Sequence, residues 1–185
     1  MEIDLETVKK AIAGDADAFT YLYSTMYKAM YSYAYFLLGR TADAEDAVAD
    51  TVVDAWEGIG SLREPAAFRV WIYRILSAKC MRRRAYYANE PASLNERSGT
   101  DDRTDGSFAD ASGKVDEALK TRGIESPEEV LALLSGIDEQ DRNIILLHVL
   151  GGFKTREIAA MLGLRAATVR SRESRAYAKL RRMIN

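Results

Sequence analysis

Five carboxylates at steps of three and four residues are the first candidates for chemistry in this chain of 185 residues. On a helix of about 100° per residue they fall in one narrow sector. The five are Asp43, Asp46, Asp50, Asp54 and Glu57, and the set of Asp43, Asp46, Asp50 and Asp54 is called the acidic stripe below. No His, Cys or amide lies among them, so we expect neither a metal site nor acid–base catalysis. An unneutralised stripe repels itself, and it is either a solvated face or a docking face for a basic partner.

Basic side chains gather in two blocks of an otherwise acidic chain. The whole chain has 26 Lys and Arg against 28 Asp and Glu, which gives a net charge of -2. Residues 65–88 nevertheless carry a net charge of +6, and residues 153–185 carry +7. Two basic segments within an acidic chain indicate two places that contact a polyanion.

The first basic block falls on a predicted helix over residues 66–87. Its core stripe is formed by Phe68, Trp71, Ile72, Ile75 and Leu76. Basic residues interleaved with aromatic ones suit single-stranded or distorted DNA, because bases stack on rings and phosphates contact cations. The alternative is that the rings pack inside the fold and the cations form a solvated face. The residues outside the core stripe include Arg69, Tyr73, Arg74, Ser77, Lys79, Arg82, Arg83, Arg84, Tyr86 and Tyr87.

The second basic block contains the pattern of a helix-turn-helix between Thr155 and Ser174. Small Ala159 falls where the two helices cross closely, and Gly163 falls where the turn needs a positive φ angle. The second helix of such a motif enters the major groove, where Arg binds guanine edges and Ser or Thr holds phosphate. Its candidate residues are Arg165, Thr168, Arg170, Ser171, Arg172 and Arg175. A helical hairpin with a solvated basic face is the alternative.

The rest of the sequence offers no constellation for catalysis. The single His148 lies in an apolar run and the single Cys80 lies beside a core stripe, so we expect His148 to pack or cap and Cys80 to pack. We therefore predict no enzyme, no metal and no cofactor. No run of eighteen apolar residues occurs, and the acidic N-terminus lacks the order of a secretion signal. We expect a cytoplasmic protein that does not insert into a membrane.

Helices must position all of these residues. Apolar residues at three- and four-residue steps predict a helix from Phe19 to about Gly39 and another that starts after Thr41 as its N-cap. Residues 89–125 are rich in Ser, Gly, Asp and Asn and bury too little apolar surface to offset their ordering entropy. The predicted fold is all-α, with two small helical domains joined by a flexible acidic linker. The domains span residues 1–88 and 126–185, the linker spans 89–125, and helices in the second domain begin near Ser126, Glu139, Thr155 and Ala166.

Several segments together resemble the bacterial sigma factors. Residues 43–52, which read DAEDAVADTV, and 62–75, which read LREPAAFRVWIYRI, look like sigma region 2. Residues 137–142 (IDEQDR), 155–159 (TREIA) and 168–172 (TVRSR) look like region 4. The absence of a domain between them is similar to the compact extracytoplasmic-function (ECF) group.

The resemblance implies a subunit that binds core RNA polymerase and directs promoter recognition, DNA opening and transcription initiation. By analogy Asp43, Asp46, Asp50 and Asp54 dock on the polymerase. The residues implied at the -10 element are Arg63, Arg69, Tyr73, Ser77, Arg82, Arg83 and Arg84. Those implied at the -35 element are Thr168, Arg170, Ser171, Arg172 and Arg175. Promoter DNA and core polymerase are the expected partners, and an anti-sigma factor is a further candidate.

Four positions depart from the pattern of the family. They are Ala49, Ala78, Ala167 and Ser174, and they bear on which promoter is read rather than on whether one is read. The alternative function is an autonomous helix-turn-helix regulator with an N-terminal dimerisation or sensor domain. Such a regulator needs neither the acidic stripe nor the basic-aromatic helix.

Overall fold

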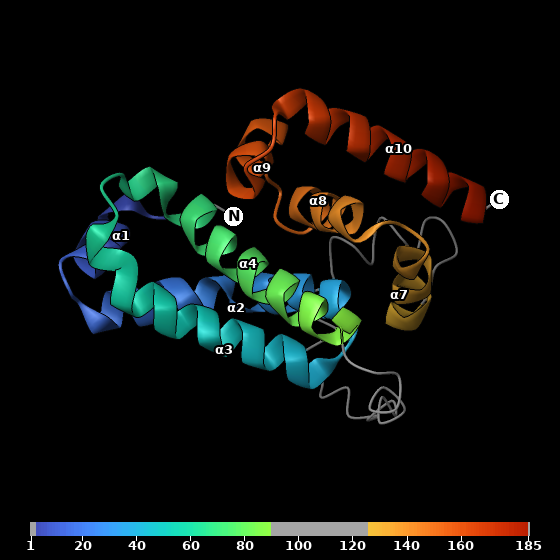
Figure 1. Cartoon of the computed structure of the whole chain (residues 1–185). Helices are drawn as coiled ribbons and strands as arrows, with labels where there is room; N and C mark the ends of the chain where they lie inside the picture. Colours follow the sequence, from blue (N-terminus) through green and yellow to red (C-terminus); the bar gives the residue numbers. More distant parts are fainter. Residues whose placement is uncertain (1–2, 90–125, 185) are drawn as a thin grey trace.

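The computed structural model of the chain describes residues 3–89 and 126–184, and all regular structure in these two ranges is helical. The first range holds α1 (Leu5–Ile12), α2 (Ala16–Leu38), α3 (Thr41–Gly58), the short turns η1 (Ile59–Ser61) and η2 (Pro65–Ala67), and α4 (Phe68–Asn89). The second holds α7 (Pro127–Ser135), α8 (Glu139–Val149), α9 (Thr155–Leu162) and α10 (Ala166–Ile184). The all-α prediction is confirmed (Figure 1). The predicted linker lies, apart from Asn89, outside the described residues.

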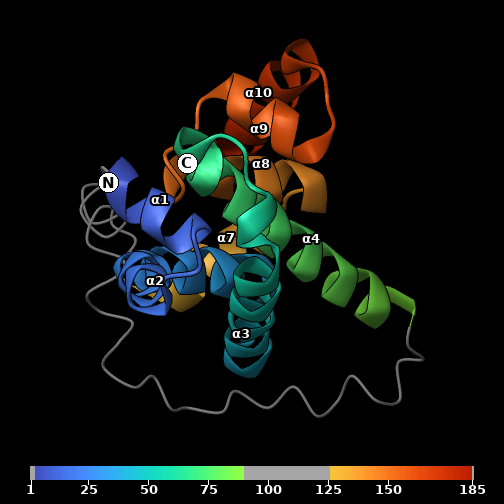
Figure 2. The same cartoon turned by 90° about the vertical axis from the view of Figure 1, so that its left-hand side faces the viewer.

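In the first half, α2, α3 and α4 pack along one another, and α1 packs on α2 (Figure 2). Helix α2 ends where expected, because Gly39 takes a left-handed φ of 76°. The prediction of Thr41 as an N-cap is wrong. Arg40 has the extended backbone of the cap, and Thr41 is already the first residue of α3. Helix α4 starts two residues later than predicted, because residues 65–67 form η2 instead.

In the second half, local sequence signals set the helix starts. The Ser126 hydroxyl accepts a hydrogen bond from the Glu129 N–H at 3.2 Å, which caps α7 at its predicted start. Gly163 joins α9 to α10 with a φ of 65°, as the helix-turn-helix pattern requires. Ile158 and Val169 are fully buried between the helices of this half.

The two halves pack directly against each other. Helix α8 contacts α2 and helix α9 contacts α4, so α8 lies between α10 and the first half in both overall views (Figure 1, Figure 2). The buried apolar residues of both halves belong to one core cluster. In the described ranges, no helix combines the length and the apolar character needed to cross a membrane.

Candidate polymerase and DNA interfaces

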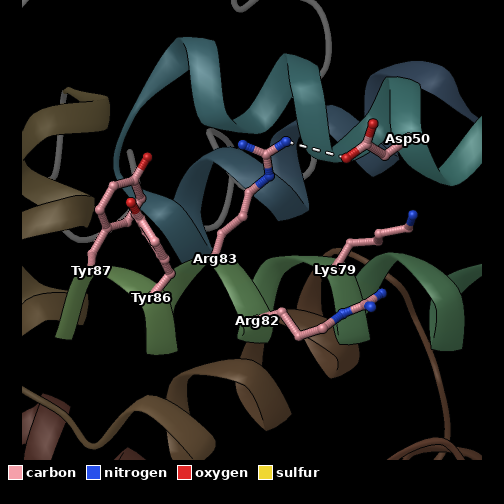
Figure 3. A pocket seen from close by; sticks show the side chains of 6 residues that line it. All are labelled: Asp50, Lys79, Arg82, Arg83, Tyr86 and Tyr87. Carbon is pink, nitrogen blue, oxygen red and sulfur yellow. Dashed lines mark hydrogen bonds and ion pairs between the residues drawn. The ribbon is translucent and has the colours of Figure 1, made fainter. Parts of the chain in front are cut away.

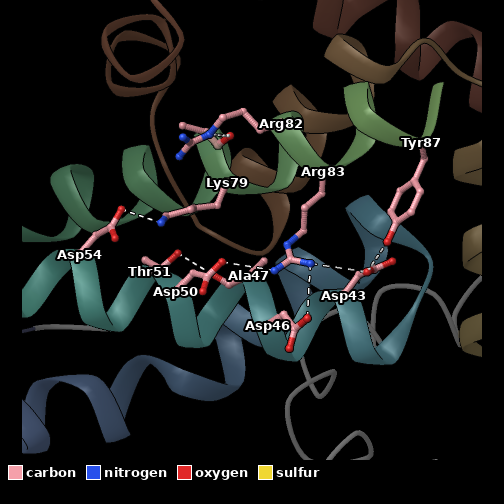
Figure 4. Close-up of polar contacts among 11 residues, drawn as sticks. Asp43, Asp46, Ala47, Asp50, Thr51, Asp54, Lys79, Arg82, Arg83 and Tyr87 are labelled. Carbon is pink, nitrogen blue, oxygen red and sulfur yellow. Dashed lines mark hydrogen bonds and ion pairs between the residues drawn. The ribbon is translucent and has the colours of Figure 1, made fainter. Parts of the chain in front are cut away.

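The acidic stripe of α3 runs beside α4, which supplies cations to it. Lys79 Nζ lies 2.7 Å from Asp54 Oδ2 (Figure 4). The Arg83 guanidinium lies 3.2 Å from Asp50 Oδ2 and 3.4 Å from Asp46 Oδ2. The stripe is therefore neutralised in part within the chain, which periodicity within α3 alone does not reveal.

Three carboxylates of the stripe keep an accessible side. The side chains of Asp46, Asp50 and Asp54 are 67%, 53% and 46% exposed. Asp43 differs, because its side chain is only 8% exposed and its Oδ1 accepts a 2.7 Å hydrogen bond from the Tyr87 hydroxyl. This hydrogen bond raises the pKa of the Tyr87 phenol. Asp43 thus joins α3 to α4, and the other three can reach a partner.

Basic and aromatic residues lie together at the C-terminal part of α4. A groove there is lined by Asp50, Lys79, Arg82, Arg83, Tyr86 and Tyr87 (Figure 3). Arg82 and Tyr86 are exposed, whereas Arg83 forms ion pairs with Asp46 and Asp50 of the acidic stripe. Arg63 is exposed between η1 and η2. This is the part of α4 where cations and rings lie together on the surface.

The middle of α4 is covered by the second half of the chain. Tyr73 and Ser77 are 2% and 3% exposed. The Tyr73 ring lies 4.9 Å, centroid to centroid, from the ring of Phe153, and the Arg69 guanidinium carbon lies 4.4 Å from the centre of the same ring. Arg84 donates to the Leu37 carbonyl at 3.3 Å. Of the two alternatives for this helix, packing inside the fold holds for the Tyr73 ring, and Ser77 is buried beside it, because α4 is covered on two sides.

Helix α10 is the second helix of the helix-turn-helix, and most of its candidate DNA-binding residues face the solvent. Thr168, Arg170, Ser171 and Arg175 are exposed. Arg172 instead lies 2.7 Å from Asp141 Oδ1, and this hydrogen bond raises the pKa of its guanidinium. A second carboxylate, that of Asp138, lies 3.3 Å from the same nitrogen. Arg172 therefore fixes α10 to the start of α8, a role that no local pattern signals because the partners are more than thirty positions away.

Within residues 3–89 and 126–184, no group of three or more His, Cys, Asp and Glu side chains is arranged to hold a metal ion. Cys80 is fully buried, and burial raises the pKa of its thiol to about 12. The expectation that His148 packs or caps is wrong: it is exposed at the end of α8, with Nδ1 3.2 Å from Glu173 Oε1.

The fold and these surfaces define a class of helical DNA-binding protein that carries a helix-turn-helix and a separate acidic helix. Residues 22–88 match the family described as Sigma-70 region 2, and residues 128–180 match Sigma-70, region 4. The ECF RNA polymerase sigma factor SigM of Mycobacterium tuberculosis is 30% identical over 98% of this chain and 84% of its own length. SigL of the same species is 31% identical over 94% of this chain and 93% of its own length.

A solved structure also resembles this chain. CnrH, in complex with the cytosolic domain of CnrY, has a TM-score of 0.69 and 26% identity, and the match covers 98% of this chain and 96% of CnrH. The chain belongs to the ECF RNA polymerase sigma factors. It is a transcription initiation factor, so the alternative hypothesis of an autonomous helix-turn-helix regulator does not hold.

Proposed function

We propose that this sigma factor divides promoter recognition between its two halves. Residues 1–88 dock on core RNA polymerase and contact the -10 element, residues 126–185 contact the -35 element, and residues 89–125 connect them. The observation that carries this division is the separation of exposed charge: carboxylates on α3 and cations on α10. A negatively charged helix surface suits a basic protein partner, and a positively charged helix surface suits DNA.

Polymerase docking uses the exposed carboxylates of the acidic stripe, with Asp43 holding α3 in place against α4. Their accessible sides can bind a basic partner surface, and exchange of Arg83 for partner cations preserves their neutralisation. A buried Asp43 contributes through the position of the stripe rather than by direct contact.

Substitution of stripe carboxylates by amides tests this docking, because an amide removes the negative charge without placing a positive charge beside Arg83. We expect Asp46→Asn with Asp50→Asn to weaken binding to purified core polymerase about tenfold or more, because charged contacts at an interface are lost. Glu45→Gln is the matched control, since Glu45 is exposed on α3 outside the stripe. Fluorescence anisotropy with labelled protein measures the affinity. Full affinity in the double variant would contradict the docking assignment.

DNA contacts fall on two elements in this proposal. At the -10 element, the opened strand meets the cations and rings of α4 and the turn before it. At the -35 element, duplex DNA meets α10. The residues are Arg63, Arg69, Tyr73, Ser77, Arg82, Arg83 and Arg84 for the first, and Thr168, Arg170, Ser171, Arg172 and Arg175 for the second, with Arg172 acting through the position of α10.

DNA opening requires the polymerase. Unstacking about ten base pairs costs on the order of 10 kcal/mol, at roughly 1.4 kcal/mol per step. Stacking of one or two captured bases returns only about 1 to 3 kcal/mol each. The sigma factor therefore captures a strand that the whole complex opens.

The four departures from the family pattern concern promoter choice. Ala49, Ala78, Ala167 and Ser174 are all exposed, so none is needed for the core and each is available to a partner. We further infer that the protein acts in the cytoplasm, that it catalyses no reaction of its own and uses no cofactor, and that an anti-sigma factor is a candidate partner. Capture of such a partner on immobilised sigma factor, followed by loss of polymerase binding, tests the last point.

A further inference from the structure

Helix α10 carries exposed cations beyond the residues proposed at the -35 element. Thr168, Ser171 and Arg175 of that set are followed by Lys179 and Arg182, and the five positions recur at steps of three and four residues. Residues at such steps share one side of a helix. All five are exposed. Arg175, Lys179 and Arg182, which form the C-terminal part of this side, are called the basic track below.

The packing of α10 turns the basic track outward. Val169 and Ala176, on the packed side of the helix, are 0% and 2% exposed. Arg172 fixes the rotation of the helix through its 2.7 Å contact with Asp141. The first half of the chain lies beyond α8, away from α10 (Figure 1). The basic track is therefore accessible to a partner in the free chain.

The basic track also keeps its charge. On α4, in contrast, Lys79 pairs with Asp54 at 2.7 Å. Helix α10 has one acidic residue, Glu173, whose side chain is only 14% exposed and lies 3.2 Å from His148 Nδ1. In the described parts of the chain, no carboxylate forms an ion pair with a residue of the basic track. Uncompensated cations in one line attract a polyanion.

The length of α10 indicates where the basic track meets DNA. The 19 residues from Ala166 to Ile184 span about 28 Å, whereas the major groove is about 12 Å wide. A helix that inserts its first turns into the groove therefore leaves it before its own end. Lys179 and Arg182 lie about 14 Å and about 18 Å along the axis from Arg170, so they are placed beside the phosphates at the edge of the groove.

We propose that the basic track binds the phosphate backbone of duplex DNA beside the -35 element and reads no bases. The proposal rests on the -35 contacts proposed above. Contacts to phosphate position a protein on the duplex, whereas contacts to base edges select the sequence. The basic track thus adds affinity for any duplex and holds α10 in the groove, while Arg170 and its neighbours discriminate between sequences.

Two exposed cations can be removed without changing a residue proposed at the -35 element. The test variant is Lys179→Gln with Arg182→Gln. The matched control is Lys9→Gln with Lys10→Gln, which removes the same charge from exposed positions of α1. Cations near a helix C-terminus also stabilise the helix itself. A role confined to that effect lowers the melting temperature of the test variant but leaves its DNA binding unchanged, which would overturn the proposal.

The salt dependence of binding measures the phosphate contacts directly. The probe is a fluorescein-labelled duplex of random sequence and about 20 base pairs, titrated with the full chain between about 30 and 200 mM NaCl. We expect the slope of log K against log [NaCl] to become less steep by about 1.8 in the test variant, which is about 0.9 for each lost phosphate contact. Lys179→Gln alone should change the slope by about 0.9, and the control should keep the slope of the wild type. An unchanged slope in the test variant would refute the phosphate contacts.

Binding of the polymerase complex to promoter duplexes separates this proposal from the -35 assignment. With single base changes across the -35 element, the test variant should weaken binding to every sequence by the same factor. Arg170→Ala should instead relax the preference at one base pair. A changed sequence preference in the test variant would mean that the basic track reads bases, against the proposal. An unchanged preference in Arg170→Ala would contradict the -35 contacts themselves.

Discussion

At the scale of single residues, charge alone does not say whether a side chain serves a partner or the fold. Asp43 and Arg172 belong by type and spacing to the polymerase and DNA surfaces, yet each is used inside the molecule. Asp43 accepts a hydrogen bond from Tyr87, and Arg172 binds Asp141. Such pairs join positions far apart in the chain, so local periodicity cannot distinguish them from their exposed neighbours.

The position of α10 depends on Arg172. We expect a double-mutant cycle of Arg172→Ala and Asp141→Asn to give a coupling free energy of about 1 kcal/mol, because the pair is only partly buried. Arg172→Ala should weaken binding to all -35 duplexes by a similar factor. Arg170→Ala, in contrast, should cost about 1 to 3 kcal/mol at one base pair and relax specificity there. A change in sequence preference for Arg172→Ala would mean that this residue reads bases directly.

At the scale of elements, short-range signals were sufficient for the helix-turn-helix. Helices α9 and α10 begin at Thr155 and Ala166 as predicted, because the apolar positions, small Ala159 and Gly163 all act within a few residues. Helix α4 was predicted less well. Its periodicity shows the core stripe of its own half, but the second side, with Tyr73 and Ser77, is buried by a distant part of the chain.

The turn between α9 and α10 offers a test of this local specification. Gly163 has a φ of 65° and no atom within 4 Å of an added Cβ, so Gly163→Ala adds backbone strain without a clash. We expect a loss of about 1 kcal/mol in the free energy of unfolding, measured by urea denaturation. Gly60→Ala is the control, since Gly60 has no positive φ and its nearest neighbour atom lies at 4.0 Å. Equal stability of Gly163→Ala and the wild type would contradict the role of the left-handed turn.

At the scale of the whole molecule, the separation of charge was visible in the sequence but the arrangement of the halves was not. The net charges of +6 and +7 marked the two basic segments within a chain of net charge -2. The contact of Tyr33 with Asn143 spans 110 positions and leaves no periodic trace in either helix. A family resemblance can supply the order of the regions, but polar contacts between the halves depend on the particular residues that meet.

Transcription in vitro tests the central claim most directly. Core polymerase is mixed with this protein and a library of genomic DNA fragments, and the 5′ ends of the transcripts are sequenced. We expect new start sites that share two upstream elements at a fixed spacing, with selection at the farther element relaxed by Arg170→Ala. Start sites identical to those of core polymerase alone, under conditions in which the protein is folded, would contradict the assignment as a sigma factor.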